Sequence, residues 1–174
     1  MNRLSGLAAA LALLTAGCSA LDEQPPPPAA SAPVSAAPAP TPTFTDVSRG
    51  DTESVVNLLK YDARALAVVV EPTVFLDGTA FCTAFGIPGT DARCERDWVT
   101  EESKIKVTLP VSTRAKLLTV RGGDPECIDE RTGAGACPWS KAELTRQAAP
   151  AGGILIRLTT EDGTATRIAE LFLP

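Results

Sequence analysis

The stretch GILIRLTTEDGTATRIAELFL, residues 153–173, decides the fold class of this chain. Two runs rich in β-branched and aliphatic residues, 153–160 and 164–173, flank the loop Glu161-Asp162-Gly163. Asp-Gly between two such runs is typical of a β-hairpin, because both residue types tolerate the positive φ angles of tight turns. The spacing fits a two-residue turn or a loop with a glycine bulge, so the register stays open. We therefore expect an antiparallel hairpin here.

Further strands are expected upstream of this hairpin. Residues 65–76 (ALAVVVEPTVFL) are rich in strand formers, and Pro72 indicates a sheet edge or a bulge. Residues 104–111 (KIKVTLPV) alternate up to Leu109 and predict a half-buried strand, and residues 115–121 predict another. Residues 54–60 fit either a strand or a helical turn. These runs favour a mostly antiparallel sheet.

One helix is expected over residues 139–147. Ser140-Lys141-Ala142-Glu143 has the pattern of a capping box, in which Ser140 and Glu143 satisfy each other's backbone amides. Trp139 and Leu144 occupy the two positions of a hydrophobic staple around that cap. The predicted fold class is therefore α+β, a mostly antiparallel β-sheet with one or two short helices, and a small β-sandwich is the alternative.

The organisation of the chain follows from its composition. Of 174 residues, only those from 51 to 174 carry strand and helix patterns, which is the size of one domain. Residues 18–50 are rich in Pro and Ala, with no charge from Gln24 to Thr45 and eight of the 15 prolines between Pro25 and Pro42. Such a segment cannot bury apolar surface, so we expect an extended, solvated stalk. A docking site for a proline-binding module is the alternative.

The first 17 residues predict a secretion signal, with Arg3 ahead of an uncharged, mostly apolar stretch. Leu14-Thr15-Ala16-Gly17-Cys18 resembles the lipobox of bacterial lipoproteins, with Thr15 where an aliphatic residue is commoner. This resemblance implies cleavage before Cys18, a diacylglycerol on its sulfur and attachment to the outer face of the cell membrane. Two or more acyl chains would make that attachment stable. A buried or free cysteine is the alternative for Cys18.

Four further cysteines follow the export signal, and export places them in an oxidising compartment. Three pairings of four cysteines are possible. Neighbours in sequence are favoured, because each pair brackets its own turn-rich segment, so we predict the disulfides Cys82–Cys94 and Cys127–Cys137. A structural zinc site is disfavoured, since its ligands usually come in closely spaced pairs.

The sequence offers little for catalysis. It lacks histidine and has 16 Lys and Arg against 21 Asp and Glu, which gives no reason to expect nucleic acid. No cofactor is expected, because no nucleotide fingerprint is present. The acidic loop around Cys127 is a weak calcium candidate, and the charged segment before residue 104 is a weak candidate for paired catalytic carboxylates. The two sets are Asp124, Glu126, Asp129 and Glu130, and Asp97, Glu101 and Glu102.

The segments YDARALAVVVEPTVFLDG and TTEDGTATRIAELFLP resemble a loose group of lipoproteins and secreted proteins from actinobacteria. The likeness spans most of residues 54–174, and it implies a sheet-rich fold and no particular activity. We therefore expect a cell-envelope lipoprotein whose domain is a non-catalytic binding module for an envelope protein or a cell-wall component. A small hydrolase that uses carboxylates or a bound ion is one alternative, and a carrier of small solutes is the other.

Overall fold

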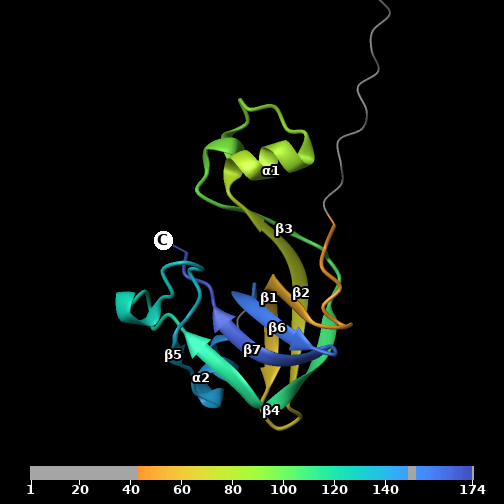
Figure 1. Cartoon of the computed structure of the whole chain (residues 1–174), viewed down its shortest axis with the longest axis vertical. Helices are drawn as coiled ribbons and strands as arrows, with labels where there is room; N and C mark the ends of the chain where they lie inside the picture. The colour runs from red at the N-terminus through yellow and green to blue at the C-terminus, as the bar shows by residue number, and fades with distance from the viewer. Residues whose placement is uncertain (1–42, 149–151, 174) are drawn as a thin grey trace, which may run out of the picture. The chain divides into compact units, whose positions relative to one another are not determined.

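The computed structural model describes residues 43–148 and 152–173 (Figure 1). The predicted signal peptide, Cys18 and most of the predicted stalk lie outside these residues. The helices and strands, in chain order, are β1 Thr52–Asp62, β2 Ala67–Leu76, α1 Gly78–Phe85, the 3₁₀ helix η1 Ala92–Glu95, β3 Val99–Glu102, β4 Val107–Thr119, the 3₁₀ helix η2 Pro125–Cys127, β5 Cys137–Pro138, α2 Lys141–Gln147, β6 Ile154–Glu161 and β7 Thr164–Glu170.

These strands form one mostly antiparallel sheet that closes on itself. The order is β3-β2-β1-β6-β7-β4-β5, and an additional pairing of β2 with β4 joins the two sides. Five strands, β1, β2, β4, β7 and β6, thus complete a small barrel, with β4 and β7 paired in parallel. A five-stranded Greek-key barrel with a helix before its last two strands is the architecture of the OB fold. The predicted α+β class is confirmed, and the sheet is a closed one rather than a sandwich.

The hairpin of β6 and β7 has the shorter of the two turns that the sequence allowed. Glu161 pairs with Thr164, so the turn consists of Asp162 and Gly163, which have φ angles of 48° and 71°. Two positive φ angles define a type I′ turn, whose twist matches that of the strands. A Cβ on Gly163 would lie 2.4 Å from the carbonyl oxygen of Ser48, so the turn also requires glycine for space.

Two predicted strands prove to be one. Residues 107–111 and 115–119 of the two predicted runs belong to the single strand β4, Val107–Thr119, while 104–106 and 120–121 lie outside it. Residues 54–60 lie in the strand β1. The break in alternation after Leu109 marks an irregularity in pairing, not the end of a strand. From Val111 to Lys116 β4 advances five residues, while β7 advances only two, from Ala165 to Arg167. This β-bulge bends β4 so that it pairs first with β2 and then with β7.

Pro72 lies inside β2 rather than at a free edge. Its cross-strand partner in β1 is Val56, and on its other side β2 changes neighbour from β4, which pairs up to Val70, to β3, which pairs from Thr73. A proline is tolerated there because the ladder is interrupted at that residue and no amide donor is missed.

Helix α2 and its cap have the predicted form. Ser140 Oγ accepts a hydrogen bond from the Glu143 amide at 3.2 Å, and the Glu143 carboxylate accepts from the Ser140 amide at 3.3 Å. The staple residues Trp139 and Leu144 are both buried in the core of the barrel. The helix therefore packs against the barrel through its N-terminal turn and through Ala148, which follows its last residue.

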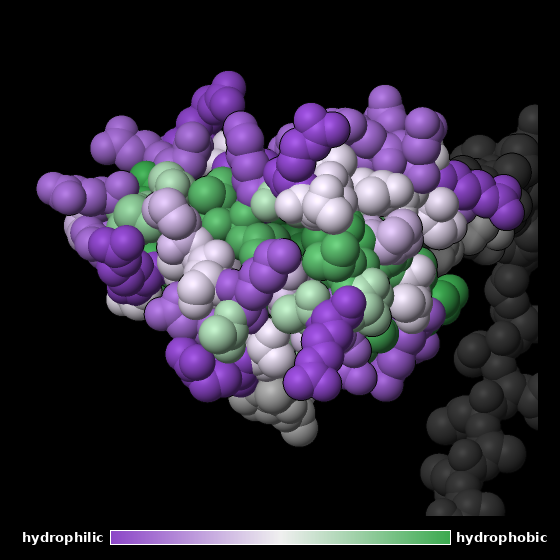
Figure 2. Space-filling model, turned by 90° about the horizontal axis from the view of Figure 1, so that it is seen from below, coloured by the Kyte–Doolittle hydropathy of each residue, from purple (hydrophilic) through white to green (hydrophobic). Residues whose placement is uncertain are grey.

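The core lies inside the barrel and begins before the predicted domain boundary. Val56, Leu58, Ile156 and Ile168 are fully buried there, and Val47 is buried with them. The folded part thus includes at least four residues more than the predicted start at residue 51. Ile105 is the one strongly exposed large hydrophobic side chain among residues 43–148 and 152–173. The hydrophobic strip in Figure 2 is crossed and bordered by hydrophilic side chains.

Between β2 and β3 the chain forms an arm, residues 77–98, that contains α1 and η1 and lies beyond the barrel (Figure 1). Its two helical pieces pack chiefly against each other. A Cβ on Gly78 would lie 2.3 Å from the carbonyl oxygen of Arg93, so only glycine permits this close approach. Phe81 is buried and stacks on Phe85, with the two ring centroids 4.2 Å apart. The arm is thus a small packed unit of its own.

Candidate functional site

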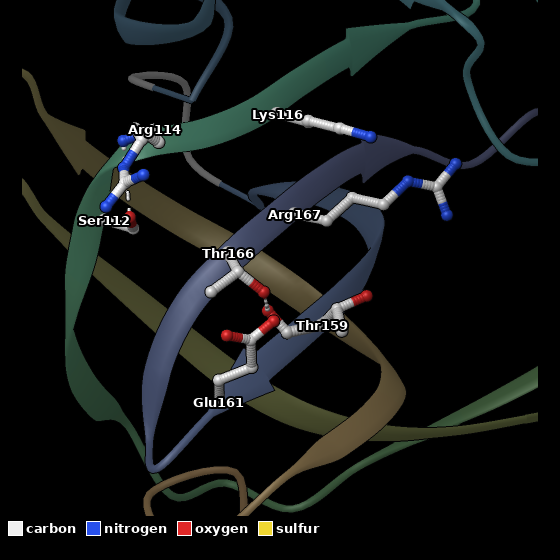
Figure 3. A pocket seen from close by; sticks show the side chains of 7 residues that line it. All are labelled: Ser112, Arg114, Lys116, Thr159, Glu161, Thr166 and Arg167. Carbon is white, nitrogen blue, oxygen red and sulfur yellow. Dashed lines mark hydrogen bonds between the residues drawn. The ribbon is translucent and has the colours of Figure 1, made fainter.

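A shallow pocket of about 550 Å³ lies on the outer face of β4, β6 and β7 (Figure 3). We call it the basic groove, because three of the seven residues that line it are cationic and one is anionic. Its lining consists of Ser112, Arg114, Lys116, Thr159, Glu161, Thr166 and Arg167.

The bulge in β4 shapes this groove. The extra residues between Val111 and Lys116 carry Ser112 and Arg114 away from the β7 ladder, so the sheet surface is hollowed beside Thr166. Beyond the bulge the register resumes with Lys116 opposite Arg167. In Figure 3 the Lys116 and Arg167 side chains run in the same direction, while Arg114 lies beside Ser112 at the other end.

The cations of the groove have no ionic partner within the described residues. The four ion pairs found there join Asp46 to Arg49, Asp91 to Arg93, Glu102 to Lys104 and Glu53 to Arg157. Like charges on neighbouring strands destabilise a sheet when they lie directly opposite each other. Lys116 and Arg167 occupy such positions. A bound anion would relieve this repulsion and gain charge-assisted hydrogen bonds.

Hydroxyl groups line the floor of the groove. Ser112 Oγ accepts a hydrogen bond from the Arg114 amide at 3.3 Å, and Thr166 Oγ1 donates to the carbonyl oxygen of Thr159 at 3.5 Å. Figure 3 shows the Glu161 side chain on the same side as these threonines. The groove thus has its cations on β4 and β7, and Thr159 and Glu161 flank them on β6.

Both predicted disulfides are present. The Sγ atoms lie 1.99 Å apart in Cys82–Cys94 and 2.01 Å apart in Cys127–Cys137, so the geometry agrees with the local pairing expected from the sequence. The first bridge joins α1 to η1 within the arm. The second joins η2 to β5 and closes the loop that follows β4. Both bridges lie away from the basic groove, and their role is structural.

The acidic loop around Cys127 does not form a metal site. Across residues 43–148 and 152–173, no three Asp, Glu or Cys side chains gather closely enough to hold an ion. Asp124 caps η2 by accepting from the Glu126 amide at 3.1 Å, and Asp129 accepts from the amide and hydroxyl of Thr132. These bonds to Thr132 lower the pKa of Asp129. The weak calcium candidate, which also included Glu130, is therefore not supported by the geometry, because its carboxylates do not gather and those of Asp124 and Asp129 accept hydrogen bonds from their own loop.

The candidate catalytic carboxylates are likewise dispersed. Glu101 and Glu102 follow each other on β3, and Glu102 forms an ion pair with Lys104. Asp97 is exposed between η1 and β3, and none of these three carboxylates lines the basic groove.

A second pocket, of about 340 Å³, does hold two carboxylates, Glu143 and Glu170. Glu143 belongs to the capping box, and its hydrogen bonds with Ser140 lower its pKa. Glu170 accepts from the Thr119 hydroxyl at 2.5 Å and from the Val120 amide at 3.1 Å. A general acid needs a raised pKa, which is opposite to the shift of Glu143, so this pocket gives the hydrolase alternative little support.

The two tryptophans pack against other residues of the fold, and neither lines the basic groove. Trp139 is 5% exposed and belongs to the core. Trp98 stacks on Phe75 with ring centroids 6.3 Å apart, at the base of the arm.

No helix in the described part of the chain is long and apolar enough to cross a membrane.

Sequence reasoning missed Arg114, Lys116 and Arg167. Arg114 precedes the predicted strand 115–121 and Lys116 lies in it, and their alternation with Ala115 is a signal for two cations on one face if the strand begins earlier. The pairing of Lys116 with Arg167 depends on the parallel contact of β4 and β7, which no local pattern indicates.

Comparisons with protein-family models, with curated proteins and with solved structures find no match to this chain.

Proposed function

We propose that this chain is a lipid-anchored protein of the cell envelope whose domain is a non-catalytic binding module for an anionic ligand. The observation that carries this proposal is the basic groove, where Arg114, Lys116 and Arg167 line one concave surface without a carboxylate partner in the described residues. Fold alone does not assign a function, so the argument rests on this surface and not on the OB-type barrel.

The physical case is one of uncompensated charge. The whole chain has a formal net charge of −5, yet this groove gathers three cations. Holding two of them on adjacent strands costs free energy unless a counter-charge is present. A hydrogen bond to a charged group contributes about 1.5–3 kcal/mol, so a ligand that engaged both cations would gain affinity by a factor of ten or more.

The anchor and the stalk give this module its setting. Lipid on Cys18 would hold the chain to the outer face of the cell membrane, and the Pro/Ala-rich segment 25–42 would carry the domain up to about 55 Å from it. The ligand would then be a component of the envelope. Replacing Cys18→Ser is expected to abolish labelling with a fatty-acid probe in cells, and continued labelling would contradict the anchor.

Binding can be tested on the full chain in a neutral detergent with three anionic probes: polyphosphate, polygalacturonate and a glycerol phosphate polymer. We expect at least one probe to protect the amides of residues 112–116 and 159–167 from hydrogen exchange at low salt, and added salt to weaken the protection. The probe should be recovered with its length unchanged.

The variant Lys116→Gln/Arg167→Gln is expected to lose the protection, while Arg64→Gln is the matched control, because Arg64 is exposed in the β1–β2 turn and does not line the groove. Three results would overturn the proposal: no probe binds, the double variant binds as well as the native chain, or a probe is shortened.

A further inference from the structure

We infer that the basic groove recognises an extended ligand with two anionic groups joined by a hydroxyl-bearing segment, which is the chemistry of a polyol phosphate polymer. This inference rests on the proposed function and names the class of anion that the groove would take.

The charge of the lining sets how many negative charges the ligand would bring. Arg114, Lys116 and Arg167 carry three positive charges, and Glu161 is the one carboxylate among the groove residues. The lining therefore has a net charge of about +2, which two negative charges would neutralise. A ligand with a single charge would leave one cation without a partner.

The distribution of the cations sets the spacing of those groups. Arg114 and Lys116 are two residues apart on β4, which corresponds to about 6–7 Å along a strand. Figure 3 shows Arg114 at one end of the groove and the Lys116–Arg167 pair at the other. One compact anion would have to draw these side chains inward to reach them all. An extended ligand whose two anionic groups lie about 6–7 Å apart would contact both ends of the groove without moving these side chains.

The rest of the groove lining favours a hydroxylated ligand. Thr166 precedes Arg167 on β7, Thr159 is the cross-strand partner of Arg167 on β6, and Glu161 lies farther along β6, so these side chains flank the cations on one side (Figure 3). A carboxylate accepts hydrogen bonds from ligand hydroxyls, and threonine hydroxyls both donate and accept. No aromatic side chain lines the groove, so it lacks the platform on which nucleobases stack. These features favour a flexible polyol over a base-bearing chain.

Phosphodiesters suit the two ends of the groove. Each diester carries one negative charge and offers two unbridged oxygens, which arginine can contact bidentately. Ser112, beside Arg114, adds a hydroxyl donor at that end. A polymer of diesters presents charges at regular intervals, as the two ends of the groove require.

Chain length is the variable that tests this inference. Calorimetric titration of the full chain in neutral detergent at low salt would compare glycerol phosphate oligomers of one to six units. We expect the affinity to rise at least tenfold between one unit and two or three, because the second anionic group binds within a complex already formed, and then to level off.

Two variants assign the ends of the groove. Arg114→Gln should reduce the affinity for the longer oligomers to nearly that for one unit and leave one-unit binding unchanged. Arg167→Gln should weaken the binding of every length, and the control Arg64→Gln should weaken none. Equal losses at all lengths in Arg114→Gln would overturn the two-ended arrangement.

The outcomes separate this inference from the proposed function. If one unit binds through the groove and longer oligomers bind no better, the two-anion ligand is wrong and the binding module stands. If polygalacturonate or an oligothymidylate binds through the groove more tightly than the glycerol phosphate oligomers, the polyol phosphate class is wrong. If none of these anions binds, both proposals fail.

Discussion

The two disulfides close loops of nearly equal length, yet their removal should have unequal effects. The cysteines are separated by 12 residues in Cys82–Cys94 and by 10 in Cys127–Cys137. Closing a loop of this size in the unfolded chain contributes about 3 kcal/mol in either case. The difference must therefore come from what each bridge holds in the folded protein.

The Cys127–Cys137 bridge holds a loop that is part of the barrel. Cys127 is fully buried, and the loop hydrogen-bonds to the end of β7 and beyond, from the Gly135 amide to the Glu170 carbonyl at 2.7 Å and from the Phe172 amide to the Gly133 carbonyl at 2.8 Å. Replacing both cysteines by alanine should lower the free energy of unfolding by about 3 kcal/mol and the midpoint by about 10 °C.

The Cys82–Cys94 bridge holds the arm, whose helical pieces pack chiefly against each other. Without the bridge the arm can unfold while the barrel stays intact, so the global loss is limited to the free energy of that local unfolding. We expect less than about 1 kcal/mol for Cys82→Ala/Cys94→Ala, with rapid hydrogen exchange confined to residues 78–95.

The assay follows Trp139, which reports on the barrel core, during unfolding in urea without reductant. The variant Trp98→Phe removes the other tryptophan and keeps a ring against Phe75. Equal losses of stability in the two double variants, or a larger loss from the arm, would refute the reasoning that the arm unfolds independently.

Three further changes test the core, the hairpin turn and the acid response. Leu144→Ala should destabilise the domain by about 3 kcal/mol in urea titration, because this fully buried side chain fills the space between α2 and the barrel; a loss below 1 kcal/mol would mean that the helix is not part of the core. Gly163→Ala should lower the thermal midpoint, because the φ of this residue is 71° and the new Cβ would clash with the Ser48 carbonyl. An unchanged midpoint would show that the turn relaxes freely. The hydrogen bonds from Thr132 lower the pKa of Asp129 below its ordinary value of 3.8, so its contribution is present above about pH 4 and is lost as the pH falls through the folded-state pKa. Asp129→Asn should therefore be less stable than the native chain at pH 7, and the difference should shrink as the pH falls below about 4, whereas a constant difference would contradict this linkage.

Local sequence patterns were enough to predict the hairpin and the helix. Asp162-Gly163 between two strand-forming runs, and Ser140 three residues before Glu143, each specify a structure through contacts within a few residues. The disulfide pairing was accessible for the same reason, since each pair closes a short loop. In all these cases the interacting groups are close in sequence.

Features that depend on long-range pairing were not accessible in the same way. The alternation that marks a strand breaks at the bulge in β4, so the sequence predicts two strands where the barrel has one. Val47 precedes the first strand and stands between the polar residues Asp46 and Ser48, and nothing in its immediate sequence indicates burial in the core. Its place depends on the β6–β7 turn, more than 100 residues later, where Gly163 packs against Ser48.

The basic groove and the closure of the barrel have one structural origin. In this barrel β4 closes the sheet, because its first part pairs with β2 and its second part with β7. The bulge between Val111 and Lys116 lies where β4 passes from one partner to the other, and it bends the strand beside the groove. Ala115 packs against the core, but Thr113 and Arg114 are exposed and Ser112 is half-buried, so the core constrains these three side chains little. Serine and arginine at 112 and 114 are thus available for ligand binding, and they can be substituted there without loss of the core that positions them.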